Sequence, residues 1–597
     1  MSSKRNKSKK HASGPGRKGG LFIALIAGGV IAGGVIGFRY LRGPSPEKYG
    51  ARPKGTITYT KDIAPILQRQ CVNCHRPGES AHLDLVSYAD AQKNAKVISR
   101  VVGTRYMPPW LPERGFGEFQ DERRLTVDEI GLIQQWVAEG SAEGDKKDTP
   151  AMPTLVEGWQ LGKPDLVITM PQPFLVPANG KDIYRNFVIP IPISGTRYVT
   201  AVEFRPGNGK VVHHAAMRID TTSNSRRLDA QEPGPGFGGM MMPESTSVPN
   251  GQFLNWQPGK LPYRAPEGLS WGLHENTDMV VQLHLRPGTQ LERVQSSIGL
   301  FFTDKAPVKE AFKIILDAPT IDIPAGERNY VAKDSFTLPV DVELYAIFPH
   351  CHYLGKELEG YATLPDGTKK WLLRIRQWDF DWQGDYRFKE PVTLPKGTTV
   401  SMQFSYDNSA ENLRNPHSPP RRVVFGPQST DEMGELWLQA VPRSASDFRT
   451  LSDSYTAREI AKIISTSDYK LKNNPDDVTA RVRMGKALMT QQRVDEARAQ
   501  FEIATRLSPQ NDECHYLLGV ALRIGQQPAR AKGEFELALK LNPQNFKAHG
   551  NLAHIFLDQQ NLGDAQMHFE KALEINPDDI LARAGLAEVE RRKNRRP

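Results

Sequence analysis

The spacing of apolar positions changes twice along the chain. Residues 125–140, LTVDEIGLIQQWVAEG, place Ile130 and Ile133 on one face of a predicted amphipathic helix. From about residue 150 to 445, alternating runs such as RYVTAVEF and DMVVQLHL are separated by Pro and Gly turns, and long helical periodicity is missing. Helical spacing returns after residue 469. The pattern predicts a helical module, a β-module long enough for two small sandwiches, and a helical tail.

The N-terminal residues join a basic tail to an apolar run. Residues 1–20 contain seven basic residues and no acid, so most of the net charge of +9 belongs to the tail and we expect no nucleic-acid partner. Residues 21–38 carry no charge, and eighteen such positions are enough to cross a bilayer as a helix. The basic flank is expected on the cytoplasmic side, which places the rest of the chain in the periplasm. The alternative is a cleaved signal peptide, but no small-x-small site precedes RYLRGPSPE, which favours an uncleaved anchor.

The pentapeptide CVNCH, residues 71–75, has the spacing that attaches c-type haem. Cys71 and Cys74 stand three positions apart and can form thioethers to the two haem vinyl groups, while the adjacent His75 is placed to be an axial ligand. A zinc site would need a second Cys/His pair nearby, and a redox dithiol would need a βαβ context. Neither follows in the sequence, so covalent haem c is the expected cofactor.

A second axial ligand is offered by RYMPPW, residues 105–110. Met107 is the only methionine between CVNCH and residue 152, and the two prolines after it exclude helix and stiffen the loop. The alternative is a methionine of the core. The stretches KDIAPILQRQCVNCHRPGE and MPPW resemble a small class I cytochrome c domain over about residues 55–147, which implies an all-α module with His75 and Met107 on the iron.

Half of the 14 histidines fall in the β-module, and four of them form two pairs. In FPHCHYLG, His350 and His352 stand at i and i+2, so a strand sends both to one face and Cys351 to the other. In KVVHHAAM, His213 and His214 are adjacent, so sharing one metal ion requires a bend or a strand end. A single histidine is usually a hydrogen-bonded core or surface residue, but two tight pairs in one module predict metal binding.

The motifs KVVHHAAM, MVVQLHL, HCHYLGKE and STDEMGELWL resemble, in order and spacing, the copper type II ascorbate-dependent monooxygenases, the peptidylglycine-hydroxylating and dopamine β-monooxygenase group. The resemblance implies two β-sandwich domains, each with one copper ion, across a solvent-filled cleft. It also implies three ligands for the electron-transfer copper and three for the catalytic, oxygen-binding copper: His213, His214 and His284, then His350, His352 and Met433. A thioether beside two imidazoles suits Cu(I).

Three departures and open points accompany this resemblance. His274 competes with His284 as third ligand of the first site, although QxH at a strand end fits His284 better. The animal enzymes are rich in disulfides, whereas this module has only Cys351, so packing must hold its sandwiches together. Peptide-amidating members place an arginine where this chain has Phe348, and an apolar side chain cannot bind a carboxylate. A peptide ending in glycine is therefore not the expected substrate, and Phe348 with Trp437 predicts apolar contact.

The expected reaction inserts one atom of O₂ into a C–H bond and needs two electrons from outside. A covalently tethered cytochrome is a one-electron donor at high effective concentration. We therefore expect electrons to pass from a respiratory-chain component or an ascorbate-like reductant to the haem, then to the first copper and then to the second.

The C-terminal tail repeats with a fixed period. Pro475, Pro509, Pro543 and Pro577 recur every 34 residues, the period of tetratricopeptide repeats. Small and aromatic packing positions recur with them: Gly485 and Gly519, then Ala497/Phe501/Ala504, Ala531/Phe535/Ala538 and Ala565/Phe569/Ala572. The tail thus resembles three tetratricopeptide repeats and a terminal helix. A concave face of such an array implies a protein or peptide partner, and a plain structural cap is the alternative.

With 39% hydrophobic and 24% charged residues, the 597-residue chain has the composition of folded domains. The predicted order is a basic tail, a transmembrane anchor, a cytochrome c domain, two copper-binding β-sandwiches, a linker and an α-solenoid: 1–20, 21–38, 55–147, 150–303, 304–445, 446–468 and 469–597. The expected function is a membrane-anchored periplasmic copper monooxygenase. The alternatives are a haem and copper electron-transfer or scaffold protein without hydroxylase activity, and a zinc hydrolase, for which no Glu base stands next to either histidine pair.

Overall fold

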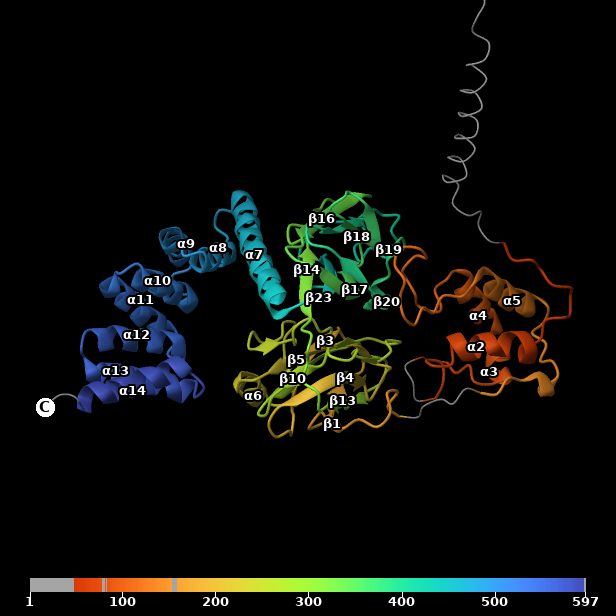
Figure 1. Ribbon diagram of the computed structural model, residues 1–597, viewed down its shortest axis with the longest axis horizontal. Coiled ribbons are helices and arrows are strands. Elements are labelled where there is room, and N and C mark those ends of the chain that lie inside the picture. The colour runs from red at the N-terminus through yellow and green to blue at the C-terminus, as the bar shows by residue number, and fades with distance from the viewer. Residues whose placement is uncertain (1–47, 78–80, 82, 153–157, 595–597) are drawn as a thin grey trace, which may run out of the picture.

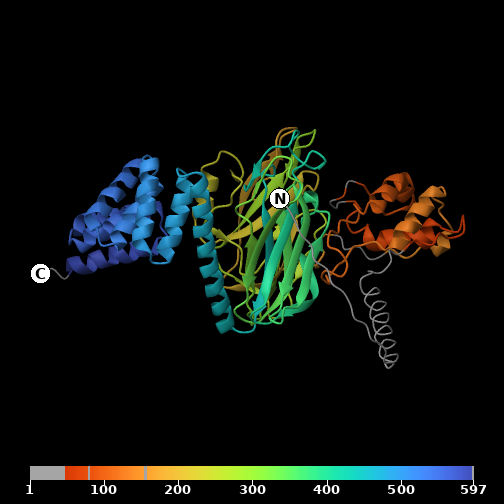
Figure 2. The same cartoon turned by 90° about the horizontal axis from the view of Figure 1, so that it is seen from above.

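The computed structural model describes residues 48–77, 81, 83–152 and 158–594. They form three bodies in a row, with helices at both ends and a strand-rich region between them, and both views agree on this order (Figure 1, Figure 2). The chain is thus multidomain, as its pattern predicts. The expected anchor at 21–38 lies outside the described residues, and among the helices that are described none is long and apolar enough to span a bilayer.

The N-terminal module is built from short helices around one apolar core. Ile130 and Ile133 are both buried there, as the spacing of residues 125–140 predicts, and the indole of Trp136 packs beside them. The elements are η1 (Tyr59–Ile63), α2 (Ala64–Gln70), α3 (Tyr88–Lys93), α4 (Ala95–Gly103), α5 (Val127–Ala138) and η2 (Lys146–Asp148).

Two antiparallel sheets enclose a single core in the first β-unit. One sheet runs in the order β1 (Leu166–Thr169), β13 (Ser297–Thr303), β4 (Arg197–Arg205), β10 (Trp271–Leu273), with β9 (Tyr263–Arg264) beside β4. The other runs β6 (Phe237–Gly238), β3 (Ile183–Pro190), β11 (Asp278–Leu285), β5 (Val212–Asp220), β7 (Thr246–Ser247), with β8 (Asn255–Trp256) beside β5. A small ribbon and one helix complete the unit: β2 (Phe174–Val176), β12 (Glu292–Val294) and α6 (Asn224–Ala230).

The second β-unit is again a sandwich of two sheets around one core. Its first sheet runs β14 (Phe312–Asp317), β23 (Gly434–Pro442), β17 (Val342–Cys351), β20 (Tyr386–Leu394). Its second sheet runs β16 (Tyr330–Thr337), β21 (Thr399–Tyr406), β18 (Gly355–Thr363), β19 (Lys369–Ile375). Three short elements lie at the edges: β15 (Asp322–Ile323), β22 (Val423–Val424) and the 3₁₀ helix η3 (Phe380–Trp382).

An irregular segment of the N-terminal module lies along the second sandwich. The backbone N–H of Glu113 donates to the carbonyl of Arg374 over 2.8 Å, and that of Gln120 donates to Arg387 over 2.8 Å. Phe119, between them, is 2% exposed and belongs to the core of the sandwich. The module predicted at 55–147 therefore contributes part of its chain to the core of the second sandwich.

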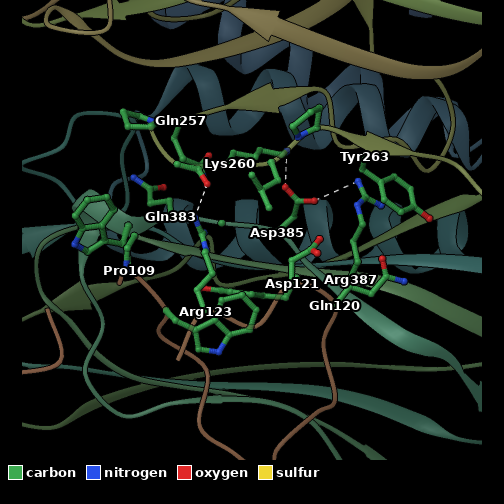
Figure 3. Close-up of a pocket in the computed structure, with 18 residues that line it drawn as sticks. Pro109, Gln120, Asp121, Arg123, Gln257, Lys260, Tyr263, Gln383, Asp385 and Arg387 are labelled. Carbon is green, nitrogen blue, oxygen red and sulfur yellow. Dashed lines mark hydrogen bonds and ion pairs between the residues drawn. The ribbon is translucent and has the colours of Figure 1, made fainter. Parts of the chain in front are cut away.

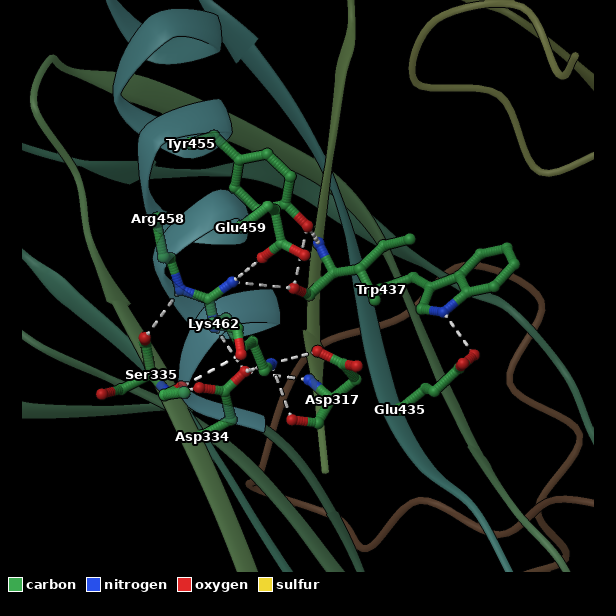
Figure 4. Close-up of polar contacts among 11 residues, drawn as sticks. Asp317, Asp334, Ser335, Glu435, Trp437, Tyr455, Arg458, Glu459 and Lys462 are labelled. Atoms are coloured by element: carbon green, nitrogen blue, oxygen red, sulfur yellow. Dashed lines mark hydrogen bonds and ion pairs between the residues drawn. The ribbon is translucent and has the colours of Figure 1, made fainter. Parts of the chain in front are cut away.

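Residues 446–468, expected only as a linker, form most of the long helix α7 (Ala445–Asn473). The helix is fastened to the second sandwich by a charged cluster, in which Asp334 accepts from both Arg458 and Lys462 (Figure 4). Burial pushes the pKa of Asp334 up, but the hydrogen bond and charge of Lys462, with those of Arg458, outweigh it and hold that pKa below its usual value. Tyr455 adds a hydroxyl that bonds the backbone of Ile315 over 3.0 Å. The connection is thus a docked helix.

Three helix pairs and a last helix follow, as the 34-residue period predicts. Gly485 and Gly519 each face a phenyl ring of the next helix, Phe501 and Phe535, so a small residue is needed at both positions. The elements are α8 (Val478–Thr490), α9 (Val494–Leu507), α10 (Asp512–Ile524), α11 (Pro528–Leu541), α12 (Phe546–Asp558), α13 (Leu562–Ile575) and α14 (Ile580–Asn594).

Candidate functional site

His213, His214 and His284 come together at the ends of the paired strands β5 and β11. The Nδ1 atom of His213 lies 3.2 Å from Nδ1 of His214 and 3.2 Å from Nδ1 of His284, and the third side of this triangle measures 3.3 Å. Ligands of a tetrahedral ion with metal–nitrogen bonds of about 2.0 Å lie about 3.3 Å apart. Within the described part of the chain, this is the one group of three His, Cys, Asp or Glu side chains close enough to share an ion.

A β-bulge turns the two adjacent histidines toward one point. On β5, His214 pairs with His284 and Val212 pairs with Leu285, so His213 is an extra residue without a partner on β11. A bulge re-aims the side chain of the extra residue, which an uninterrupted strand would send to the opposite face. The bend that the HH pair requires is therefore present.

Two imidazoles of this triangle, those of His214 and His284, are held in the neutral form that binds metals. The Nε2–H of His284 donates to the Oδ2 of Asp182 over 2.6 Å, which leaves the Nδ1 lone pair facing the other two rings. Burial lowers the pKa of His284 to about 4, although Asp182 pulls it upward. Burial and the neighbouring His284 lower the pKa of His214 far below its usual value. At neutral pH both rings offer a lone pair.

His274, the competitor for the third position, lies elsewhere. Its ring is exposed, and its Nδ1 lies 3.0 Å from the hydroxyl oxygen of Thr196. The structure brings His284, and not His274, to the HH pair.

The second histidine pair stands at the end of β17. The rings of His350 and His352 have centroids 5.2 Å apart. The Nδ1 of His350 lies 2.6 Å from the Oε1 of Gln383, and the Nδ1 of His352 lies 3.2 Å from the carbonyl oxygen of Asp431. Because both acceptors engage Nδ1, both Nε2 atoms stay available to a metal. Cys351 is buried in the sandwich core on the other face, as the alternation predicts.

A buried carboxyl group joins this pair to Met433. Glu432 is 0% exposed, and its two oxygens accept hydrogen bonds from the backbone N–H groups of His352, Leu354 and Met433. The hydroxyl of Tyr406 donates to the carbonyl of Met433 over 3.0 Å. Burial raises the pKa of Glu432 to about 8, although the three N–H groups oppose the shift. The main chain of Met433 is thus fixed beside that of His352, and sequence reasoning missed the residue that does it.

The two histidine sites face each other across one phenyl ring. Phe380 has its centroid 6.5 Å from the ring of His213 and 5.5 Å from the ring of His352. The family resemblance implies a solvent-filled cleft here, whereas the structure has an aromatic side chain in contact with both sites.

Cys71, Cys74, His75 and Met107 all line one cavity of about 560 Å³. The Nδ1–H of His75 donates to the carbonyl of Leu83 over 2.9 Å, which leaves its Nε2 unengaged by that bond. Burial raises the pKa of Cys71 to about 12, so this side chain is a thiol and not a thiolate at neutral pH. The volume lies in the range of cofactor pockets, about 300–1,000 Å³.

The wall of this cavity reaches the first histidine site. His213, Arg286 and Asp381 line it together with the residues of the N-terminal module. One wall residue carries a buried donor, the Nε of Arg123, for which the described residues supply no acceptor. Such a donor suits a ligand with acidic groups.

A small pocket of about 90 Å³ marks where the N-terminal module meets both sandwiches (Figure 3). Lys260 of the first sandwich forms a buried ion pair with Asp385 of the second, and Arg387 pairs with the same carboxylate at 3.3 Å. Arg123 of the N-terminal module donates to the carbonyl of Gly259 over 2.7 Å. Breaking one member of a buried charge cluster is costly, so this junction holds the N-terminal module and the two sandwiches in one arrangement.

Comparison with known proteins identifies the tail. Residues 482–546 and 516–580 match the family model described as tetratricopeptide repeat. None of the curated proteins compared with the chain matches it.

Among solved structures, the first tetratricopeptide domain of Spaghetti bound to an HSP90 peptide is 21% identical over 20% of this chain and 93% of that chain, with a TM-score of 0.19. MamA is 20% identical over 25% and 81%, with a TM-score of 0.22. The Sgt2 domain from Aspergillus fumigatus is 21% identical over 20% and 80%, with a TM-score of 0.19. On the family match, the C-terminal region of this chain is a tetratricopeptide repeat region.

Proposed function

We propose that this protein is a copper-dependent monooxygenase that inserts one atom of O₂ into a C–H bond, with electrons delivered through a covalent c-type haem. The observation that carries the proposal is the triangle of three Nδ1 atoms with sides of 3.2 to 3.3 Å, one of whose histidines, His213, lines the same cavity as Cys71, Cys74, His75 and Met107. The proposed copper site and the proposed haem site would therefore be neighbours.

The first triangle fits a copper ion that passes electrons. Three imidazoles suit copper, and two of the rings are fixed before the ion arrives, because Asp182 orients His284 and the bulge orients His213. His213, His214 and His284 would hold the ion.

The second pair fits the copper ion at which oxygen is used. His350 and His352 would hold it through Nε2, with Met433 as the soft third ligand, and Glu432 fixes the main chain of two of these three residues. Copper supplies oxygen activation when it is bound. This second site distinguishes a monooxygenase from a haem and copper electron-transfer protein, which needs only one copper.

The cavity fits a haem. Two cysteine thiols stand at thioether spacing, His75 has its Nδ1 bonded so that Nε2 can bind iron, and Met107 lines the same cavity. The buried Nε–H of Arg123 suits one of the two carboxylates that a haem carries.

The surroundings of His350 favour an apolar substrate group. Phe348 stacks at 6.2 Å from the His350 ring and packs against Trp437 at 5.2 Å and Phe253 at 6.4 Å. No carboxylate-binding cation stands at the position of Phe348. A C–H substrate without a carboxylate at this point is therefore proposed.

The proposed location is the periplasmic face of a membrane, to which residues 21–38 would anchor the chain. A protein or peptide partner is proposed for the tetratricopeptide array. A respiratory-chain component or an ascorbate-like reductant is the proposed donor. These proposals follow from the sequence arguments above.

The first test is the metal and haem content of the full chain, produced with c-type haem maturation and purified. We expect one haem and two copper ions per chain, and oxygen uptake when a reductant and a C–H substrate are supplied. Haem with zinc and no copper would contradict the proposal, and so would copper without oxygen uptake under any donor.

The role of the haem in electron delivery is tested by the Met107→Leu variant. Met152→Leu is the control, because Met152 is 41% exposed. We expect Met107→Leu to keep its copper and to lose donor-supported oxygen uptake, together with a changed haem spectrum. Wild-type turnover in Met107→Leu would show that electrons reach copper by another route.

A further inference from the structure

One short segment of the second sandwich, Asp379–Gln383, contacts all three candidate redox sites. It contains the 3₁₀ helix η3 and lies between β19 and β20. Sequence reasoning gave it no role, and neither the haem resemblance nor the copper resemblance involves it.

At the haem end, the contact is made by Trp382. Its indole lines the cavity that also holds His75 and Met107. Its ring meets that of Tyr106 edge-on, with centroids 5.8 Å apart, and Tyr106 is the residue before Met107.

At the first histidine site, the contacts are made by the two preceding residues. The Oδ1 of Asp381 lies 3.5 Å from the Nε2 of His213 and 3.3 Å from Arg286. The ring of Phe380 lies 6.5 Å from that of His213.

At the second histidine site, both ends of the segment take part. Phe380 lies 5.5 Å from the ring of His352, nearly perpendicular to it. Gln383 engages the Nδ1 of His350 over 2.6 Å. One side chain, Phe380, therefore touches a ligand residue of each histidine site.

The segment is fixed in place from both sides. The Oδ1 of Asp379 accepts from the backbone N–H of Asp381 over 3.1 Å, and its Oδ2 accepts from Arg414 over 2.8 Å. Just before it, the indole of Trp378 donates to the carbonyl of His352 over 3.1 Å. Electron transfer weakens steeply with the gap between donor and acceptor, so aromatic rings held in fixed positions beside each site are a suitable path.

We propose that Asp379–Gln383 is the electron bridge of the protein, with Trp382 linking haem to the first copper and Phe380 linking the first copper to the second. The proposal rests on the proposed function. In each transfer one electron moves and no covalent bond changes: ferrous haem becomes ferric as a cupric ion becomes cuprous, and a cuprous first site then reduces a cupric second site. Trp382 and Phe380 act as positioning residues that keep the gaps short.

The test uses the full chain loaded with haem and copper, without oxygen. A photosensitiser reduces the haem in a flash, and the return of the ferric haem spectrum reports transfer to copper. We expect Trp382→Leu to slow this return by about tenfold or more, and Trp382→Phe, which keeps a ring, to restore most of the rate. Trp371→Leu, which removes a half-buried indole from β19, is the matched control and is expected to behave as wild type.

The Phe380→Leu variant tests the transfer from the first copper to the second separately from the transfer out of the haem. After the flash, we expect its ferric haem spectrum to return at the wild-type rate. Its donor-supported oxygen uptake should fall by about tenfold. Haem and copper contents and the cupric spectrum are measured in each variant, so that loss of a metal is not mistaken for a slow transfer.

Wild-type rates in both Trp382→Leu and Phe380→Leu, at unchanged haem and copper content, would overturn the bridge and leave the proposed function standing. Failure of the proposed function has a different signature: the wild-type chain itself would lack copper, or its haem return would be the same with and without copper.

Discussion

Two acidic side chains organise the histidine sites although neither is a proposed ligand. Asp182 fixes the ring of His284, from a position 102 residues away in the chain. Glu432 ties the main chains of His352 and Met433 together across 80 residues. In the sequence STDEMGEL, Glu432 is expected to be a solvated residue. Nothing local shows that its carboxyl group accepts hydrogen bonds from three backbone N–H groups. The proposed ligands could be named from the sequence, but their supports arise only when distant strands pair.

Asp182 gives a direct prediction for the first site. Asp182→Ala removes the acceptor that holds the Nε2–H of His284, so we expect copper affinity at the triangle to fall about 10- to 100-fold. Asp182→Asn, whose amide oxygen still accepts, should lose less. Copper titration measures the effect, and the exposed Asp304→Ala serves as control. Equal affinity in Asp182→Ala and wild type would show that the ring is oriented by its neighbours alone.

Glu432 gives the corresponding prediction for the second site. In Glu432→Gln an NH₂ group replaces one of the two oxygens that accept from these backbone N–H groups, so we expect unfolding free energy to fall by about 1–3 kcal/mol. Copper binding at His350 and His352 should weaken while the first triangle keeps its ion. Denaturant unfolding and copper stoichiometry test both parts, and loss of both ions together would instead point to general unfolding.

At the scale of elements, hydrophobic spacing predicted the three modules, but not the irregularities that make the sites. Alternation over KVVHHAAM indicates a strand and would send His213 away from His214. The extra residue appears only once β5 pairs with β11, because a bulge is a property of two strands in register. Likewise, residues 446–468 have weak apolar spacing, and the charged cluster with Asp334 that docks α7 is not visible locally.

The tetratricopeptide helices offer a matched pair of glycines. A Cβ at Gly519 would lie 2.6 Å from the ring of Phe535, whereas one at Gly533 would have nothing within 4 Å. We expect Gly519→Ala to destabilise the array by about 1–3 kcal/mol through overpacking. Gly533→Ala should stabilise it by about 0.5–1 kcal/mol, since alanine is the better helix former. Thermal unfolding followed by circular dichroism measures both, and a stabilising Gly519→Ala would show that Phe535 can move aside.

The docking of α7 depends on pH through Asp334. The native pKa of Asp334 is lowered, so its ionised form contributes stability above the unfolded value, about 3.9, and this contribution is lost as the pH falls through the native pKa. At pH 7 we expect Asp334→Asn to be less stable than wild type by about 1–3 kcal/mol. Below pH 4 the difference should shrink. Denaturant unfolding at both pH values checks this, and a constant difference would contradict the ionic origin.

At the scale of the whole molecule, the bodies are joined by more than their chain connections. The segment around Phe119 places part of the N-terminal module inside the core of the second sandwich. The sequence predicted a self-contained domain at 55–147, because its motifs are complete there and a shared core leaves no local mark. The Lys260–Asp385 pair adds a second joint between the sandwiches.

Phe119→Ala tests the first of these joints. Phe119 is 2% exposed, so we expect a loss of about 3–5 kcal/mol of unfolding free energy in the second sandwich. The N-terminal module should then move independently, and X-ray scattering in solution should report a more extended particle. Leu413→Ala, at a site 98% exposed, is the control. An unchanged scattering profile would mean that the backbone hydrogen bonds of Glu113 and Gln120 suffice.

The docked helix α7 also keeps the two helical ends of the protein apart. Because α7 is fastened to the second sandwich, the repeat array sits at the far end from the N-terminal module (Figure 1, Figure 2). A protein bound to the array and a reductant approaching the CVNCH end would not compete for space. Under the proposed function, a protein bound to the array would therefore leave the CVNCH end open to its electron donor.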